Sequence, residues 1–210
     1  MKKLWVLLLS VCLGLGTLVA QDINTLKQQA QKGDASAQFN LGVMYAEGQG
    51  VPQDYTQAMK WYRLAADQGN AGAQLNLGAM YYNGEGVPQD YAEAVKWCRL
   101  AADQGNEDAQ YLLGAMYAWG EGVPQDYAKA VKWYRLAADQ GDAGAQGNLG
   151  YMYRNGEGVP QDDVQAHKWF NLAAAQGDAD GANNRDRVAK RMTPQQIERA
   201  QELARNWKPK

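Results

Sequence analysis

The sequence predicts an all-α fold, a solenoid built from helix-turn-helix repeats, on the basis of two observations. First, a glycine recurs every 36 residues, at Gly33, Gly69, Gly105, Gly141 and Gly177. A fixed period of this size is typical of stacked copies of one supersecondary unit. Second, each copy repeats the letters A-Q-x-x-L-G-x-M-Y-x-x-G-x-G-V-P-Q-D-x-x-x-A-x-K-W before an alanine-rich stretch. Four repeats are therefore expected, at residues 33–68, 69–104, 105–140 and 141–176.

Residues 1–20 have the pattern of a signal peptide. Lys2 and Lys3 precede an apolar run that ends at Ala20, where small and aliphatic residues suit cleavage, and polar residues follow. An uncleaved membrane anchor is the alternative, because the run is barely long enough to cross a bilayer. We expect cleavage after Ala20, no stable membrane insertion afterwards, and a bacterial protein that is periplasmic or secreted.

The composition of the mature chain excludes some partners. Removing the two signal lysines leaves 19 basic residues against 23 acidic ones, a net charge of about −4. No basic run remains, so nucleic acid and anionic membrane surfaces are not expected as partners. Cys98 is the one cysteine left after cleavage, so no intramolecular disulfide can form.

The first helix of each repeat carries its apolar residues on one face. In the first copy Ala37, Leu41 and Tyr45 follow at intervals of four residues, a spacing typical of a buried helix face. Gly48 suits a left-handed helix end, and Pro52 cannot continue a helix. The segment between them is therefore predicted to form a fixed turn.

The second helix of each repeat is predicted to begin after an aspartate. Asp54 is placed to accept hydrogen bonds from the first free amides of that helix. Gln57, three residues later, suggests a reciprocal capping box, and Asp90 with Glu93 repeats the pair.

The two helices of a repeat are expected to pack closely. Gly42 lies inside the first helix, where a glycine costs about 1 kcal/mol, so we expect it to admit the second helix near Ala58. The second helix presents Ala58, Trp61 and Ala65 on one face. One helical pair cannot bury that surface alone, so neighbouring pairs must stack.

The two ends of the repeat array need capping helices. Residues 21–32 resemble a lone second helix and are predicted to cap the N-terminal end. Residues 177–210 are predicted to form C-terminal capping helices, the last of which starts at Thr193-Pro194. Its apolar stripe consists of Ile197, Ala200, Leu203, Ala204 and Trp207.

This repeat resembles the Sel-one-like repeat (SLR) family, which is related to tetratricopeptide repeats. The shared pattern is A-x-x-x-L-G-x-x-Y-x-x-G-x-G-V-x-x-D-x-x-x-A-x-x-W-x-x-x-A-A-x-x-G, present four times. The resemblance implies a right-handed superhelix whose first helices line a concave side, and adaptor roles in protein complexes. Cysteine-rich bacterial members linked to penicillin binding carry a disulfide in each repeat, so their activity is not transferred here.

The sequence offers no convincing catalytic, metal or cofactor site. The Gly-x-Gly turns lack the strand, third glycine and lysine of a phosphate-binding loop. Glu85, Glu121 and Glu157 recur singly in these turns, without the oxygen clusters that calcium requires. His167 is the single histidine and is interpreted as a surface or packing residue, and Cys98 as a packing residue at the position of Tyr62.

The variable positions of the first helices are the candidate binding surface. Helical geometry and the resemblance place Asn40, Asn76 and Asn148 in one row, with an aromatic or aliphatic row beside it. Amide side chains can both donate to and accept from a peptide backbone, and aromatic residues anchor interfaces. An ordinary polar face is the alternative. The candidate binding residues are Phe39, Asn40, Leu75, Asn76, Tyr82, Tyr111, Trp119, Asn148 and Tyr151.

These features favour a non-enzymatic scaffold of the cell envelope. Its partner would be an extended peptide or a protein, held in the concave groove. The alternative is a cell-wall-acting enzyme or a glycan-binding protein, including a host-contact factor, because aromatic residues also suit a sugar ring. A hydrolase needs paired carboxylates in a cleft, whereas the acidic residues here recur mainly at turns and caps.

Overall fold

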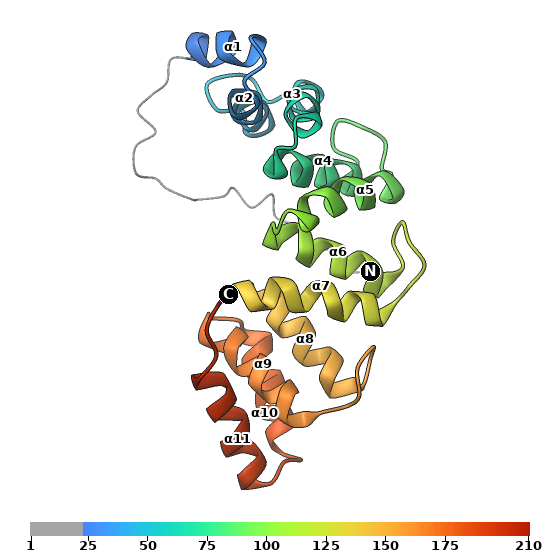
Figure 1. Ribbon diagram of the computed structural model, residues 1–210, viewed down its shortest axis with the longest axis vertical. Coiled ribbons are helices and arrows are strands. Elements are labelled where there is room, and N and C mark those ends of the chain that lie inside the picture. Colours follow the sequence, from blue (N-terminus) through green and yellow to red (C-terminus); the bar gives the residue numbers. More distant parts are fainter. Residues whose placement is uncertain (1–22) are drawn as a thin grey trace. The chain divides into compact units, whose positions relative to one another are not determined.

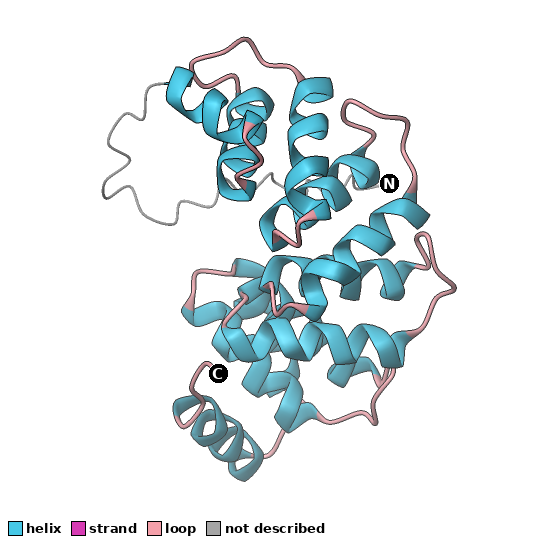
Figure 2. Ribbon diagram, turned by 45° about the horizontal axis from the view of Figure 1, so that its top comes forward, coloured by secondary structure: helices cyan, strands magenta, loops and turns pink. Residues whose placement is uncertain are grey.

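The computed structural model describes residues 23–210, so the signal peptide predicted at residues 1–20 lies outside the described residues. Within 23–210 the chain forms eleven helices and no strand (Figures 1 and 2). The helices are α1 (Ile23–Gln31), α2 (Ala35–Glu47), α3 (Tyr55–Asp67), α4 (Ala71–Asn83), α5 (Tyr91–Asp103), α6 (Glu107–Trp119), α7 (Tyr127–Gln140), α8 (Ala143–Asn155), α9 (Asp163–Ala175), α10 (Ala179–Ala189) and α11 (Pro194–Arg205). The all-α fold of helix-turn-helix repeats is confirmed.

The described residues divide into two compact units, 23–104 and 105–210. In the first unit α1 packs on α2, α2 on α3, α3 on α4 and α4 on α5. In the second unit α6 to α9 follow the same order, and both α10 and α11 pack on α9. Each helix thus contacts mainly its neighbours in the chain, as stacked repeats should.

Short polar side chains start the helices, as the sequence predicts. The Asp54 carboxylate accepts a hydrogen bond of 3.0 Å from the Gln57 amide at the start of α3. The predicted capping boxes at Asp54 and Asp90 are wrong, because the side chain three residues later does not bond back to the N-cap backbone; the Glu93 side chain pairs with Lys96 instead. The one complete capping box among the described helices starts at Thr193. The N-caps of the paired helices are Asp34, Asp54, Asn70, Asp90, Asn106, Asp126, Asp142 and Asp162.

The Gly-x-Gly turn is fixed by both of its glycines. Gly156 ends α8 with a φ of 73°, in the left-handed region where glycine is favoured, and its amide donates to the Met152 carbonyl. A Cβ on Gly158 would meet the Tyr127 carbonyl oxygen and lie 2.7 Å from the Ala128 nitrogen. The second glycine therefore lets the turn rest on the backbone that begins α7.

The glycine in the middle of each first helix does admit the second helix, but its nearest neighbour differs from the predicted alanine. A Cβ on Gly42 would lie 2.6 Å from the Tyr62 ring, and one on Gly150 would lie 2.8 Å from the Phe170 ring. The nearest atoms to Gly42 thus belong to Tyr62 and not to the predicted Ala58, whereas at Gly78 the predicted Ala94 contributes its carbonyl oxygen, 3.4 Å away, beside Cys98. In each case the neighbouring side chain leaves no room for a Cβ on the glycine.

A buried glutamine in each first helix was not predicted from the sequence. The Gln38 amide donates to the Ala30 carbonyl at 3.0 Å, and its oxygen accepts from Gln68 at 2.7 Å. Gln146 repeats both bonds in the second unit, with Ala138 and Gln176 at 3.2 and 3.1 Å. One glutamine therefore joins its own repeat to the last turn of the preceding one. Its counterparts are Gln38, Gln74, Gln110 and Gln146, all of them buried.

Replacing Gln146 by alanine is expected to lower the free energy of unfolding by about 1–3 kcal/mol. The side chain is 0% exposed, and its loss would remove the bond to the Ala138 carbonyl and the bond from the Gln176 amide, each of which contributes about 0.5–1.5 kcal/mol. Urea denaturation followed by circular dichroism measures the change. Gln201→Ala, on the exposed face of α11, is the control and should change stability by less than about 0.5 kcal/mol. Equal effects for both variants would contradict a structural role for the buried glutamine.

Candidate functional site

A hollow of about 340 Å³ lies on the second unit. It is formed by the end of α6, the start of α7, α8 and the two turns that follow α6 and α8. We call it the α6–α8 hollow. Its lining consists of Ala118, Trp119, Gln125, Tyr127, Tyr134, Asn148, Tyr151, Met152 and Glu157.

Three aromatic side chains of the lining are accessible to solvent: Trp119, Tyr151 and Tyr127, the last of which is 37% exposed. Trp119 is the last residue of α6 and is 48% exposed, because Gly120 ends the helix directly after it. Tyr151, on α8, is 44% exposed. Exposed aromatic residues at a concave surface are typical of binding sites, since they contribute much contact area at small entropic cost.

The wall of the hollow is held by polar contacts. The Gln125 amide donates to the Ala118 carbonyl at 2.7 Å and to the Tyr127 hydroxyl at 3.1 Å. Glu157 accepts a hydrogen bond of 3.1 Å from the Asn155 amide. These bonds hold the turns that follow α6 and α8 and fix the Tyr127 hydroxyl.

Asn148 connects the hollow to the face of α6. It is hydrogen-bonded to the side chain of Tyr111, whose ring centroid lies 5.9 Å from that of Tyr134. Burial raises the pKa of Tyr111, Asp142 raises it further, and the bond to Asn148 lowers it. Tyr111 therefore stays a neutral phenol, with Asn148 fixed beside it.

Carboxylates gather at the opposite ends of the same helices. Glu107 and Asp108 lie in the first turn of α6, and Asp142 is the N-cap of α8. Burial raises the pKa of all three, and their mutual repulsion raises those of Glu107 and Asp142 further. No salt bridge to any of the three occurs among residues 23–210. We call Glu107, Asp108 and Asp142 the acidic end.

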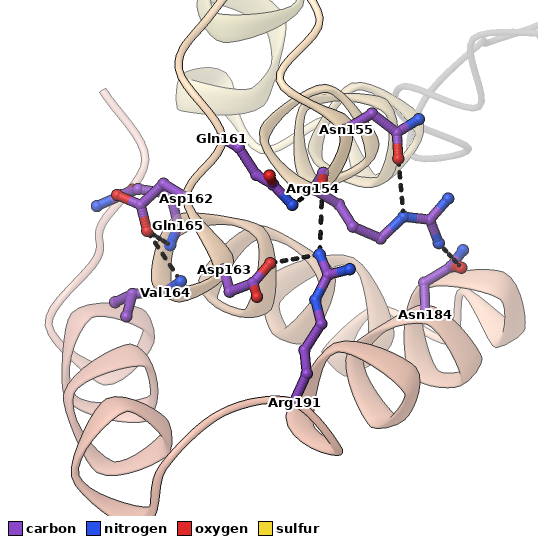
Figure 3. Close-up of polar contacts among 9 residues, drawn as sticks. All are labelled: Arg154, Asn155, Gln161, Asp162, Asp163, Val164, Gln165, Asn184 and Arg191. Atoms are coloured by element: carbon purple, nitrogen blue, oxygen red, sulfur yellow. Dashed lines mark hydrogen bonds and ion pairs between the residues drawn. The ribbon is translucent and has the colours of Figure 1, made fainter.

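The positive charge of Arg154 lies beside the hollow and is held by neighbouring side chains (Figure 3). Its guanidinium donates to Asn184 at 2.8 Å and to Asn155 at 3.2 Å, and lies 4.7 Å from the Tyr151 ring centroid. Arg191 donates to the Arg154 carbonyl at 3.3 Å. Arg154 does not line the hollow.

Each residue that lines the hollow has a counterpart in the first unit, 72 residues earlier in the sequence. Seven of the nine positions carry the same residue type in both places, as Tyr134 and Tyr62 do. The two differences are Trp119, where the counterpart is Glu47, and Tyr151, where it is Ala79. The first and third repeats with their following helices therefore share most of the lining but differ in these two exposed aromatic residues. The counterpart positions are Ala46, Glu47, Gln53, Tyr55, Tyr62, Asn76, Ala79, Met80 and Glu85.

The structure brings three of the predicted binding residues together at the hollow: Trp119, Asn148 and Tyr151. Tyr111 reaches it through Asn148. The sequence reasoning missed Tyr127, which it did not single out, and Glu157, which it considered only as a calcium ligand.

The other predicted residues lie in the first unit and differ in exposure. Asn40 is exposed, Leu75 is half-buried, and Asn76 is half-buried and hydrogen-bonded to the Tyr62 side chain. Phe39 is half-buried against Tyr62, with ring centroids 5.9 Å apart.

Tyr82 packs inside the first unit rather than on its surface. It is 6% exposed, and its ring centroid lies 5.1 Å from that of Tyr91. The sequence counterparts of Tyr82 include Ala46, so the larger ring occupies space that other repeats fill differently. We therefore assign Tyr82 to the core.

His167 and Cys98 are both buried packing residues. Burial raises the pKa of the Cys98 thiol to about 12, so it stays protonated and poorly nucleophilic. His167 is 3% exposed, and burial together with Arg185 lowers its pKa. No group of three or more potential metal ligands occurs within residues 23–210.

The stability of the protein is expected to fall between pH 7.5 and pH 5.5 because of His167. Its pKa is lowered from 6.5 in the folded state, so the unfolded chain binds the proton more readily as the pH falls. Urea titrations across this range measure the change. His167→Val, the residue type at Val95 and Val131, should remove much of the slope. The same slope in both proteins would contradict the assignment.

A family model described as Sel1 repeat matches the chain four times, at residues 35–70, 71–106, 107–142 and 143–178. These matches cover more than half of the 210 residues. Among the described residues, no helix has both the length and the apolar character that a membrane crossing requires.

Several solved structures are similar to this chain, and two of them share more than 30% of its residues over the matched region. One is c5321, a protective antigen present in uropathogenic Escherichia coli strains that displays an SLR fold, with a TM-score of 0.82 and 36% identity. That match covers 88% of this chain and 40% of c5321. The other is a Sel1 repeat protein from Oxalobacter formigenes, with a TM-score of 0.70 and 42% identity, covering 77% of this chain and 47% of that one.

A curated relative matches over a shorter stretch. The secretory immunoglobulin A-binding protein EsiB of Escherichia coli O6:H1 (strain CFT073) is 46% identical over 44 residues, which are 21% of this chain and 9% of EsiB. The chain thus spans less than half the length of each of these three relatives.

Proposed function

Since this chain belongs to the Sel1 repeat family, we propose that it is a non-enzymatic interaction scaffold that binds a partner protein through the α6–α8 hollow. The observation that carries the proposal is the pair of exposed aromatic residues that the hollow has and the first unit lacks. Trp119 and Tyr151 replace Glu47 and Ala79 of the first unit, while the other seven lining positions carry the same residue types in both places. The bound element is an extended segment that lies across α6 and α8.

The chemistry of the buried groups supports a binding role over a catalytic one. The Cys98 thiol and the His167 imidazole are both buried, and neither lines the hollow. Within the hollow Glu157 is the single carboxylate, whereas glycoside hydrolysis requires two. A glycan bound at Trp119 is an outcome that the binding experiments below would reveal.

The place of action that we propose is the bacterial envelope or its exterior. The signal-peptide pattern of residues 1–20 supports it. The relatives also support it: EsiB is named for binding secretory immunoglobulin A, and c5321 is described as a protective antigen. N-terminal sequencing of exported protein should find a chain that begins near Gln21, and a mature form that retains Lys2 would contradict the proposal.

Asn148, the asparagine that lines the hollow, is proposed to contact the backbone of the bound segment. Crosslinking followed by pull-down from the native envelope identifies the partner, and titration calorimetry then measures the affinity. Replacing Asn148 by alanine should cost roughly 1–3 kcal/mol, because an amide of the partner is left unpaired.

The control for the asparagine variant is a substitution on the surface. Substitutions of His167 or Cys98 would not serve as controls, because both residues are buried and their loss could disturb the fold. Leu64→Ala and Leu136→Ala, at exposed positions of α3 and α7, should leave the affinity unchanged. An affinity that falls for the leucine variants and not for the asparagine variant would move the site to the second helices.

A further inference from the structure

The lining of the α6–α8 hollow favours one kind of side chain. Four aromatic residues contribute to it, and Glu157 carries its single formal charge. The face of an aromatic ring attracts a cation, most strongly for tryptophan. A lysine or arginine side chain would therefore find its aromatic walls and its counter-ion in the same place.

The acidic end extends this preference along the same helices. Asp142 acts on Tyr111 electrostatically, Tyr111 is bonded to Asn148, and Asn148 lines the hollow, so the two regions are joined by direct interactions. Three carboxylates held close together without a basic partner from residues 23–210 repel one another. A positive charge from outside would relieve that repulsion, and a negative one would increase it.

Some aromatic rings of this protein already form cation–π contacts with basic side chains of the same chain. The Arg154 guanidinium lies 4.7 Å from the Tyr151 centroid, and the Lys129 ammonium lies 5.3 Å from the Tyr117 centroid. No cation from residues 23–210 lies over Trp119, although its ring is among the most exposed. The Trp119 face is therefore open to a cation supplied by a partner.

We propose that the α6–α8 hollow binds an arginine or lysine side chain of an extended basic segment, with the cation between the Trp119 ring and the Glu157 carboxylate. This inference rests on the proposed function and specifies the occupant of the same site. A second basic residue of the segment lies against the acidic end. Asp108 and Trp119 are ~16 Å apart along α6 at 1.5 Å per residue. An extended segment covers that distance in about five residues.

The experiment selects displayed random twelve-residue peptides on the full-length mature protein. Binders that also bind the variant Trp119→Asn with Tyr151→Ala are removed; asparagine stands at the equivalent positions 83 and 155, and alanine at position 79. Because both side chains are largely exposed, the variant should keep the circular dichroism spectrum and melting temperature of the parent. The expected result is enrichment of two arginines or lysines about five residues apart.

Glu157→Gln tests the charge by itself in binding measurements with the selected peptides. The expected result is at least a tenfold loss of affinity and a weaker dependence on salt. Glu85→Gln, at the counterpart position of the first unit, is the matched control and should leave the affinity unchanged.

Two results would overturn the inference, and they differ in what they say of the proposed function. Neutral, apolar or acidic peptides whose binding depends on Trp119 would leave the hollow as a binding site and reject a cationic occupant. Selection of no peptide that depends on Trp119 would reject both the occupant and the hollow.

Discussion

Replacing Gly158 by alanine is expected to lower the free energy of unfolding by about 3 kcal/mol. The φ of this residue is +71°, which costs an alanine roughly 1–2 kcal/mol. The added Cβ would also meet the Tyr127 carbonyl and the Ala128 nitrogen, which belong to the backbone and cannot rotate away. Overpacking of this kind costs about 1–3 kcal/mol more. Chemical denaturation measures the loss.

Gly177→Ala separates the two contributions to that loss. Gly177 has a φ of +94°, but no atom lies within 4 Å of the position that its Cβ would take. It should therefore show the conformational cost alone, about 1–2 kcal/mol. If Gly158→Ala costs no more than Gly177→Ala, the close contact between this turn and the start of α7 does not contribute to stability.

Replacing Trp119 by asparagine and Tyr151 by alanine is expected to lower the affinity for the partner about a hundredfold. Aromatic residues at the centre of an interface commonly contribute more than 1 kcal/mol each, and a combined loss of about 2.7 kcal/mol corresponds to a hundredfold change. The substitutions restore residue types that other repeats carry at these positions, so the fold should be unaffected. Titration calorimetry measures the affinity.

Glu47→Trp is the converse of the Trp119 substitution. It places an indole at the exposed counterpart position of the first unit, where seven of the nine lining residues are already the same. The parent affinity at the hollow should be unchanged. A fall in affinity equal to that of the hollow variant would mean that the first unit, and not the hollow, carries the binding.

The fold could be predicted from the sequence because its determinants are local. A glycine such as Gly48, at the end of α2, and an aspartate such as Asp54, before α3, each act on the helix directly beside them. A fourfold repetition of these signals then leaves few alternatives, since each copy must adopt the same two helices.

Features that depend on contacts across helices could not be predicted. The ring that faces Gly42 comes from Tyr62, twenty residues along, and the sequence alone did not distinguish it from Ala58. Gln38 looked like an ordinary polar residue, but its bonds to Ala30 and Gln68 require the exact stacking of three helices.

Part of the candidate site could be predicted because an exception to the repeat is visible in the sequence. Trp119 stands where other repeats carry Asn83 or Asn155, and no core contact requires an indole there. Tyr127 and Glu157 could not be identified in this way, because they are residues that every copy, or nearly every copy, shares. Tyr127 and Glu157 belong to the candidate site only because the exposed Trp119 and Tyr151 line the same hollow.

The most direct test of the account is photocrosslinking from two single positions in the native envelope. A benzoylphenylalanine replaces Trp119 in one protein and Leu136, an exposed residue of α7, in the other. We expect irradiation to attach the partner to position 119 and not to position 136. Attachment at position 136 with none at position 119 would contradict the claim that the α6–α8 hollow is the binding site.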